Sequence, residues 1–400
     1  MKTQEIIAKE KQFGAFNYNP IPLVIAEGSG VWVTDVEGKR YLDFLAAYSA
    51  VNQGHNHPRI KEALLEQLER IPLTSRAFHN DQMGMFLEKL CTMTGYEKAL
   101  PMNTGAEAVE TAIKAARKWG YKIKGVPENK AEIIAFTGNF SGRTTTVISF
   151  STEDQYRDGY GPFTPGFVIA EYGDYEDVAN KVNENTVAIF IEPVQGEAGV
   201  IVPPEGYLKQ LRELATANNV LLIADEIQSG FGRTGKFFCC EHEGVRPDVL
   251  VVGKALSGGY YPISAMLSDD DVMRVFTPGD HGSTFGGNPL ASAIGIAALD
   301  VLVDENLTEN SARLGEYLLE QLKTIANPLI KDIRGKGLFV GIELKPEAGG
   351  ARKYCEMLMH EGVLCKETHE DTIRIAPPLT ITKEELDIGI TAIKKVLAVK

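Results

Sequence analysis

The sequence predicts an α/β protein with a large, mainly parallel sheet and a second, smaller α+β part. Three observations predict this class. Helical and extended patterns alternate from about residue 100 to residue 270. Two extended segments, Val220–Ala224 and Val249–Val252, are apolar throughout, as strands are when helices cover both faces of a parallel sheet. From Asn288 onward, long helical patterns surround short strands, which indicates a separate α+β unit.

The elements of the first 270 residues follow from local patterns. Two short strand patterns, Gly30–Asp35 and Arg40–Phe44, flank a Glu37-Gly38 turn. Apolar residues at helical spacing predict helices at Glu107–Lys118 and Pro204–Asn218, the second with prolines at its start. Short apolar runs predict buried strands between these helices, at Ile133–Phe136 and Val187–Ile191.

The C-terminal region is predicted to be rich in helices. Helical patterns occupy Pro289–Val303, Leu307–Ile325, Arg352–Glu361 and Lys383–Val399, around strand candidates at Leu338–Leu344 and Thr372–Ile375. We therefore expect a large α/β domain over residues 51–288 and a small α+β domain over residues 289–400. Residues 1–50 are expected to pack with the small domain, which would then be built from both chain ends.

Composition excludes several classes of protein. The 400 residues carry 41 Lys and Arg against 54 Asp and Glu, a net charge of −13 that argues against nucleic acid as the main ligand. No apolar run approaches the ~20 residues that a membrane helix needs. Five scattered Cys without a C-x-x-C pair indicate a reduced, intracellular protein, and the first residues lack an apolar signal, so we expect a cytoplasmic protein. The seven His show no metal-ligand spacing, and we expect no metal site.

One interpretation of the central motifs is a P-loop NTPase. Val220–Glu226 resembles the acidic strand of such proteins, and Gly230–Lys236 nearly fits their phosphate loop. Phe237 stands where a magnesium-binding hydroxyl is needed, no helical pattern follows, and the strand precedes the loop instead of following it. These departures disfavour the interpretation.

A second interpretation begins at the ends of the predicted strands, where ligands collect in open α/β sheets. Glu192, Asp225 and Lys254 each follow one of these strands. Lys254 could be a solvated surface residue, but the buried strand before it favours a desolvated lysine able to form a Schiff base. Pyridoxal phosphate needs such a lysine and an acid at its ring nitrogen, which Asp225 could supply. Taken alone, Asp225 could equally be a helix cap or part of a loop ion pair.

Two loops could cradle the phosphate of such a cofactor. Asn103–Glu107 opens a predicted helix, whose N-terminus suits an anion, although an ordinary capped helix explains the same residues. His281–Pro289 is a glycine-rich loop that also leads into a helix. Each loop is weak evidence by itself, but with Lys254 and Asp225 they converge on one cofactor.

Four motifs together resemble the class III (ω-type) aminotransferases of pyridoxal-phosphate fold type I. They are Glu192–Glu197, Ala224–Gly235, Pro247–Gly259 and Gly282–Pro289, and the resemblance extends in order over nearly the whole chain. Within that class the chain is most similar to the members that act on ornithine. The stretches that indicate this are Phe13–Pro20, Ala47–His55, Leu73–Phe78, Pro101–Gly105, Ala116–Tyr121 and Gly138–Thr144.

The resemblance implies how the cofactor would be held. It makes Lys254 the Schiff-base lysine and proton shuttle, and Asp225 the partner of the ring nitrogen. Gln228 would contact the ring hydroxyl, Phe140 would stack on the ring, and Gly105 and Ala106 would donate to the phosphate. Ser283 and Thr284 would reach the phosphate of a neighbouring subunit, which implies a homodimer or a higher even oligomer.

The resemblance also implies the substrates. Tyr18 and Arg143 would hold the α-amino and α-carboxylate end of L-ornithine, and Tyr48 would shape the pocket. Arg374 would bind the α-carboxylate of 2-oxoglutarate, and Glu197 would cover Arg374 while ornithine is bound. The implied reaction moves the δ-amino group of L-ornithine to 2-oxoglutarate and gives glutamate 5-semialdehyde and glutamate, a step of arginine breakdown or proline formation.

Three alternatives stay open at this point. An N-acetylornithine aminotransferase would share the scaffold, but usually has Tyr-x-Arg near the N-terminus and Gly in place of Tyr48. A 4-aminobutyrate aminotransferase is more distant. A non-catalytic scaffold that binds pyridoxal phosphate is disfavoured because Lys254, Asp225, Arg143 and Arg374 are all present.

Overall fold

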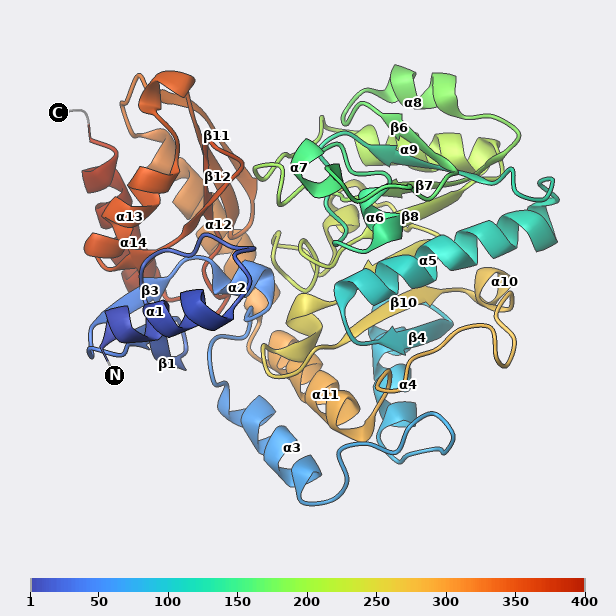
Figure 1. Cartoon of the computed structure of the whole chain (residues 1–400), viewed down its shortest axis with the longest axis horizontal. Coiled ribbons are helices and arrows are strands. Elements are labelled where there is room, and N and C mark those ends of the chain that lie inside the picture. Colours follow the sequence, from blue (N-terminus) through green and yellow to red (C-terminus); the bar gives the residue numbers. More distant parts are fainter. Residues whose placement is uncertain (1, 399–400) are drawn as a thin grey trace.

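The protein has a large and a small part that lie side by side (Figure 1). The computed structural model describes residues 2–398. The larger part holds a seven-stranded sheet, and the smaller part holds two four-stranded sheets and both described chain ends. The prediction of an α/β fold is confirmed. The domain boundaries after residues 50 and 288 stay predictions.

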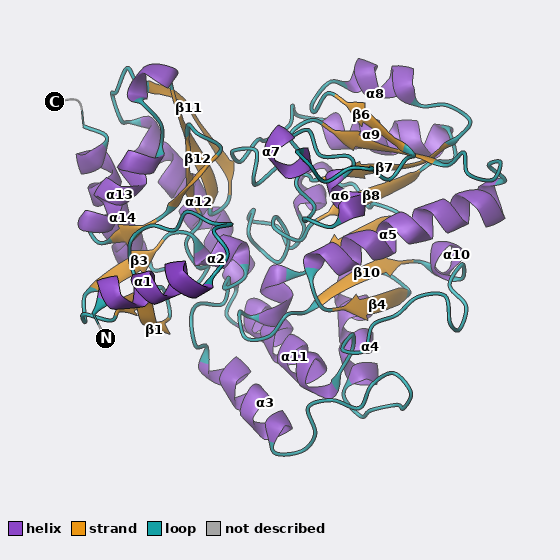
Figure 2. Cartoon of the chain, viewed as in Figure 1, coloured by secondary structure: helices purple, strands orange, loops and turns teal. Residues whose placement is uncertain are grey.

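The seven-stranded sheet is parallel except for one strand. Its order is β4-β10-β9-β8-β7-β5-β6, and β10 runs antiparallel to both of its neighbours. The strands are β4 (Lys98–Met102), β5 (Glu132–Phe136), β6 (Phe167–Ala170), β7 (Thr186–Ile191), β8 (Leu221–Asp225), β9 (Val249–Val252) and β10 (Ser264–Ser268). Strands β7 to β10 are buried at every position, because helices cover both faces of the sheet (Figure 2).

Alternate residues of each central strand enter different hydrophobic clusters. Val251 packs with the helix α5 (Gly105–Trp119) on one face, whereas Leu250 and Val252 pack with α9 (Tyr207–Ala217) and α11 (Pro289–Asp304) on the other. The other helices of this part are α3 (Pro58–Leu68), α4 (Met83–Thr94), α6 (Thr145–Ile148), α7 (Asp154–Arg157), α8 (Tyr175–Lys181) and α10 (Asp270–Met273), with short helical turns at η1 (Gly120–Lys124), η2 (Cys239–Glu243) and η3 (Lys254–Ser257).

The smaller part combines the two ends of the chain. Strand β13 (Val363–Leu364) pairs with β3 (Arg40–Asp43) in parallel, so the sheet β1-β2-β3-β13 contains N-terminal and C-terminal residues. The second sheet, β11-β12-β15-β14, is antiparallel. The remaining elements are α1 (Thr3–Phe13), β1 (Ile25–Ser29), β2 (Trp32–Asp35), α2 (Ala46–Ser49), α12 (Leu307–Lys323), β11 (Ile330–Lys336), β12 (Phe339–Leu344), η4 (Pro346–Ala348), α13 (Arg352–His360), β14 (Lys366–Thr368), β15 (Thr372–Ile375) and α14 (Lys383–Val396).

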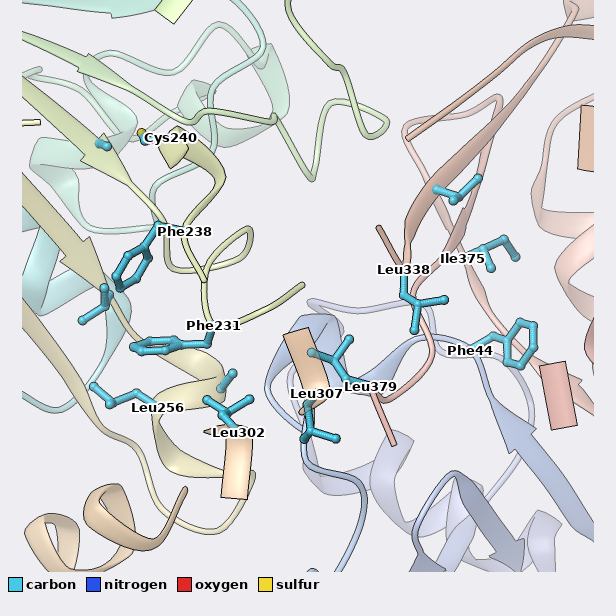
Figure 3. Close-up of a cluster of buried hydrophobic side chains, with 14 of the residues drawn as sticks. Phe44, Phe231, Phe238, Cys240, Leu256, Leu302, Leu307, Leu338, Ile375 and Leu379 are labelled. Carbon is cyan, nitrogen blue, oxygen red and sulfur yellow. The ribbon is translucent and has the colours of Figure 1, made fainter. Parts of the chain in front are cut away.

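One hydrophobic cluster runs through both parts of the molecule. Figure 3 shows Leu307 and Leu379 between Phe231 of the larger part and Phe44 of the smaller part. This continuity joins the two parts by a shared core instead of a flexible linker.

A buried arginine ties the same junction together with polar contacts. Arg233 donates to the carbonyls of Leu338 at 2.8 Å and Pro377 at 2.7 Å, and to Oδ1 of Asn52 at 2.5 Å. It belongs to Gly230–Lys236, the segment that resembles a phosphate loop. That segment forms successive turns and is followed by η2, without the long helix that a phosphate loop requires.

Two glycines bring backbones into direct contact near this junction, Gly315 within the smaller part and Gly337 between the smaller part and Thr234 of the larger part. A Cβ atom on Gly315 of α12 would lie 2.1 Å from the carbonyl carbon of Gly337. A Cβ on Gly337, whose φ is +54°, would lie 2.4 Å from the carbonyl carbon of Thr234. Only glycine fits at these two positions, because real Cβ atoms do not approach other atoms so closely.

Two properties of the described helices and side chains bear on function. Within residues 2–398, none of the helices has the length and apolar character of a membrane span. Nor does any group of three or more His, Cys, Asp or Glu side chains in that range have an arrangement that could hold a metal ion.

Candidate active site

A cavity of about 200 Å³ opens where the central strands end. Strand β8 ends at Asp225, β7 ends just before Glu192, and β9 ends two residues before Lys254. The lining residues are Gly105, Ala106, Phe140, Ser141, Gly142, Glu192, Val194, Asp225, Ile227, Gln228 and Lys254. Six residues predicted to hold the cofactor therefore meet at one cavity: Gly105, Ala106, Phe140, Asp225, Gln228 and Lys254.

The N-terminus of α5 forms part of the cavity wall, and its backbone can bind an anion. Thr104 caps the helix, and the Glu107 carboxylate accepts the backbone N–H of Thr104 at 2.7 Å and of Asn103 at 3.1 Å. Among the described residues, no hydrogen bond uses the backbone N–H of Gly105 or Ala106. These two free donors and the positive end of the helix dipole suit a phosphate.

The middle of the cavity holds an acid and an amine whose pKa values are both shifted by burial. Burial raises the pKa of Asp225 to about 6, against the opposing effects of the Ile227 backbone N–H and the Lys254 charge. Burial also lowers the pKa of Lys254, although the Glu197 and Asp225 carboxylates oppose it. A cationic ring nitrogen beside Asp225 would restore its ionised form, so this carboxyl is suited to a ring that carries a proton.

A second buried acid lies beside Asp225. Burial, reinforced by the Asp225 charge, raises the pKa of Glu192 well above its ordinary range. Glu192 accepts the backbone N–H of Phe140 at 2.8 Å, which fixes the loop that carries the Phe140 ring at the cavity.

Arg374 is the centre of a polar cluster next to this cavity. It lies on β15, its side chain is only 1% exposed, and it donates to Glu197 at 2.7 Å and to the amide oxygen of Gln228 at 2.9 Å. Burial acts to raise the pKa of Glu197, but the charge and hydrogen bond of Arg374, together with the Lys254 charge and the Gln228 amide, outweigh burial, and the net pKa is lowered. Gln228 lines the cofactor cavity and also contacts Arg374, so it links the cavity to the polar cluster around Arg374.

Tyr48 covers Arg374 from an unusual stretch of backbone. The Arg374 guanidinium lies 4.6 Å from the centre of the Tyr48 ring. All four residues of α2, Ala46–Ser49, have positive φ values between +47° and +72°, so this turn is left-handed. Left-handed backbone costs a residue other than glycine roughly 1–2 kcal/mol, a strain typical of functional sites.

The other predicted substrate residues, Arg143 and Tyr18, lie outside the lining of the cofactor cavity. The Arg143 guanidinium lies 3.8 Å from the centre of the Tyr156 ring and 5.6 Å from that of Phe140. Tyr18 is 71% exposed and shares with Tyr48 the wall of a second, largely apolar cavity of about 470 Å³.

Ser283 and Thr284 do not line the cofactor cavity of their own chain. Ser283 accepts a hydrogen bond from the Asn103 side chain at 2.7 Å, and Thr284 is exposed. Their glycine-rich loop is therefore available at the surface beside the α5 N-terminus.

Several contributors to this region were not among the predicted site residues, including Ser141, Gly142 and Val194 of the cavity wall. The Thr368 hydroxyl donates to the backbone carbonyl of Glu197, and Ile227 forms part of the cavity wall. Ile227 could have been found from its position two residues after Asp225. Thr368 carries no local signal, because 171 residues separate it from Glu197.

Comparison with known proteins agrees with this geometry. A family model described as aminotransferase class-III matches residues 13–397. The chain belongs to the class-III aminotransferase family.

Three similar proteins illustrate the position of the chain within this family. It is 59% identical to an ornithine aminotransferase of Brevibacillus brevis, over 100% of this chain and 99% of that protein. The solved ornithine aminotransferase of Toxoplasma gondii, which has partial occupancy of PLP at its active site, superimposes with a TM-score of 0.98 at 44% identity, over 99% of this chain and 94% of that one. An acetylornithine aminotransferase from Elizabethkingia anophelis superimposes with a TM-score of 0.90 at 47% identity, over 99% of each chain.

Class-III aminotransferases use pyridoxal phosphate, and the present cavity fits that cofactor. The free N–H groups of Gly105 and Ala106 suit its phosphate, Asp225 suits its ring nitrogen, and the Lys254 amine can attach to its aldehyde. The protein is therefore a pyridoxal-phosphate-dependent aminotransferase.

Proposed function

We propose that this class-III aminotransferase transfers the δ-amino group of L-ornithine to 2-oxoglutarate. The observation that carries the proposal is the covered state of Arg374. This carboxylate-binding side chain lies beside the cofactor cavity, is paired with Glu197 at 2.7 Å and is roofed by Tyr48. The arginine can therefore be closed by a carboxylate of the chain itself or opened to a carboxylate of a substrate.

The two substrates need these two states. Ornithine has one carboxylate and two amines, and a free Arg374 would bind its carboxylate and present the α-amine to Lys254. With Arg374 closed by Glu197, the α-end is left to Tyr18 and Arg143, and the δ-amine extends toward the cavity. 2-Oxoglutarate has two carboxylates, and a bidentate arginine contact for each suits Arg374 and Arg143.

The residues of the cavity then divide the chemistry. Bound pyridoxal phosphate supplies an aldehyde that receives amino groups and a ring that withdraws electrons. Asp225 keeps the ring nitrogen protonated, and Phe140 and Val194 give the cavity an apolar wall. Lys254, whose pKa is lowered by burial, moves the proton at the δ-carbon of ornithine. The products are glutamate 5-semialdehyde and glutamate, which suits proline formation and arginine breakdown.

We also propose that the active unit is a homodimer or a higher even oligomer. The exposed loop at Ser283 and Thr284 would complete the phosphate site of a neighbouring subunit. The five cysteines are free thiols, four of them buried, which supports a reducing compartment such as the cytoplasm.

N-Acetylornithine is the second candidate substrate, because an acetylornithine aminotransferase is 47% identical to this chain. The deciding experiment compares kcat/KM for ornithine, N-acetylornithine and 4-aminobutyrate with 2-oxoglutarate as acceptor. We expect ornithine to be preferred by at least about tenfold. Acetylation removes the charge of the α-amine, which would donate a hydrogen bond to the Tyr18 hydroxyl. Faster turnover of N-acetylornithine or 4-aminobutyrate would contradict the proposal.

A further inference from the structure

The segment that carries Tyr18 has almost no backbone structure of its own. Between α1 and β1, residues 15–23 make only two local backbone bonds, from Asn17 to Ala15 and from Leu23 to Ile21. Ile21 and Leu23 pack against the small part, but Tyr18 itself is largely exposed. Other contacts must therefore fix the backbone that carries Tyr18.

Those contacts come from one arginine at the start of α13. The Arg352 guanidinium donates to the carbonyl of Asn19 at 2.8 Å and to the carbonyl of Pro20 at 2.7 Å. Among the described residues, these are the only hydrogen bonds that join residues 15–23 to another segment of the chain. Both acceptors directly follow Tyr18.

Two carboxylates hold the Arg352 guanidinium in place. Its Nε donates to Glu356 at 2.7 Å, and one terminal nitrogen reaches Glu367 at 3.3 Å. The planar guanidinium has five donors in a fixed arrangement, so it can bind two carboxylates and two carbonyls together. A lysine ammonium cannot reproduce this pattern.

The same contacts connect the Tyr18 segment to the ion pair between Arg374 and Glu197. Glu367 lies on β14, where its neighbour Lys366 pairs with Arg374 of β15. The next residue, Thr368, donates to the backbone carbonyl of Glu197. Arg352 thus joins the Tyr18 segment to the strand that flanks Arg374 and Glu197.

We infer that Arg352 is a positioning residue for ornithine, which fixes the backbone that carries Tyr18 beside the cavity it shares with Tyr48, without touching the substrate. This inference rests on the proposed function, because it assigns Tyr18 to the α-end of ornithine. 2-Oxoglutarate and glutamate do not need Tyr18, so Arg352 should discriminate between the two half-reactions.

The test compares Arg352→Gln with the matched variant Arg313→Gln on the holoenzyme. Arg313 is an exposed arginine of the same part, on α12, whose side chain donates to Asn310. We expect Arg352→Gln to lower kcat/KM for ornithine about tenfold, mainly through KM, and to leave the half-reaction with glutamate within about twofold. Arg313→Gln should leave both unchanged.

A double variant then tests whether Arg352 acts through Tyr18. If it does, Arg352→Gln should lower ornithine kcat/KM much less when Tyr18→Phe is already present, because the two side chains share one effect. Chymotrypsin should also cleave after Phe16 or Tyr18 faster in Arg352→Gln than in Arg313→Gln.

Four outcomes would overturn the inference. Equal loss in both half-reactions would mean that Arg352 only supports the fold, and no loss would mean that it does not position Tyr18. Fully additive losses in the double variant would mean that Arg352 acts by another route. If the unmodified enzyme fails to use ornithine, the proposed function falls and the inference falls with it, whereas the first three outcomes leave the proposed function intact.

Discussion

Asp225 is the residue whose titration should be visible in the stability of the protein without cofactor. Its pKa is raised by burial from 3.8 to about 6. Between these values the native state holds a proton that the unfolded state has lost, so the free energy of unfolding falls as pH rises from about 4 to about 6. At 1.36 kcal/mol per pH unit, the loss reaches about 3 kcal/mol above pH 6.

Asp225→Asn removes this titration. We therefore expect the cofactor-free variant to be more stable than the cofactor-free parent at pH 7.5, by up to about 3 kcal/mol, with the difference shrinking toward pH 5. With pyridoxal phosphate bound the order should reverse, since Asp225 would then face a cationic ring. Urea unfolding of both proteins across pH 5–8 measures this, and a parent that is more stable in both forms would refute the assignment.

Glu197 should decide which amine of ornithine reacts. Glu197→Ala leaves Arg374 without its carboxylate partner, so ornithine can dock in the reverse orientation and react at its α-amine. Part of the product should then be the α-keto acid, which cyclises to a different pyrroline carboxylate. The glutamate half-reaction should be roughly tenfold faster, because no ionic bond has to be displaced first.

Single-turnover reactions with ornithine, with both cyclic products separated by chromatography, measure this effect. Exclusive formation of the semialdehyde product together with an unchanged glutamate rate would show that Glu197 is structural.

The sequence alone predicts the roles of some residues, the family resemblance predicts others, and neither predicts the rest. Lys254 and Asp225 follow apolar strands, so the sequence alone points to them. Arg374 and Glu197 are 177 residues apart in sequence, and only the family resemblance brought them together. Arg352 and Arg233 act on backbone carbonyls, which any residue can offer, and no sequence pattern marks such contacts.

Among the elements, the left-handed turn at Ala46–Ser49 gives an unusual prediction. Ala47 has φ +47° and is exposed, so glycine there should relieve strain of roughly 1–2 kcal/mol while losing up to about 1 kcal/mol of backbone entropy. We expect Ala47→Gly to be neutral or to stabilise the protein by up to about 1 kcal/mol in thermal or urea unfolding.

The matched control is Ala8→Gly in the middle of α1, where the alanine is exposed as Ala47 is. In ordinary right-handed helix the same change should destabilise by about 1 kcal/mol. Equal losses in the two variants would show that the turn at Ala47 is not strained.

Strong hydrophobic periodicity predicted the limits of the main helices and strands closely. Elements with a weak or unusual pattern were not predicted. The helix predicted at Glu107–Lys118 is found at Gly105–Trp119, and the strand predicted at Val249–Val252 has those limits. The edge strand β4 and its neighbour β10 were missed, because runs of five residues with Pro101 or two serines resemble loops. The turn at Ala46–Ser49 lacks glycine and asparagine, the residues that normally signal left-handed backbone.

At the scale of the whole molecule, the proposed sharing of sites between subunits can be tested by mixing variants. Lys254→Ala and the double variant Ser283→Ala/Thr284→Ala should each impair every site of their own homodimer. A heterodimer of the two would place both defects in one site and leave the other site intact. After subunit exchange, an equal mixture should therefore regain about one quarter of the parent activity.

The control is a mixture of Lys254→Ala with Asp225→Ala, whose defects lie in the same chain's cavity and should not complement. If the first mixture shows only the sum of its components, Ser283 and Thr284 do not serve a neighbouring subunit.

The glycine junction between the two parts also bears on how such an enzyme can evolve. At Gly337 the backbone of the smaller part lies against the backbone of Thr234, so no exchange of side chains can adjust the fit there, and an added Cβ would push the two parts away from each other. A side chain at position 337 would therefore disturb the packing of the two parts. Side chains away from this contact, such as Tyr18 and Tyr48 on the second cavity, can be replaced without disturbing the backbone fit.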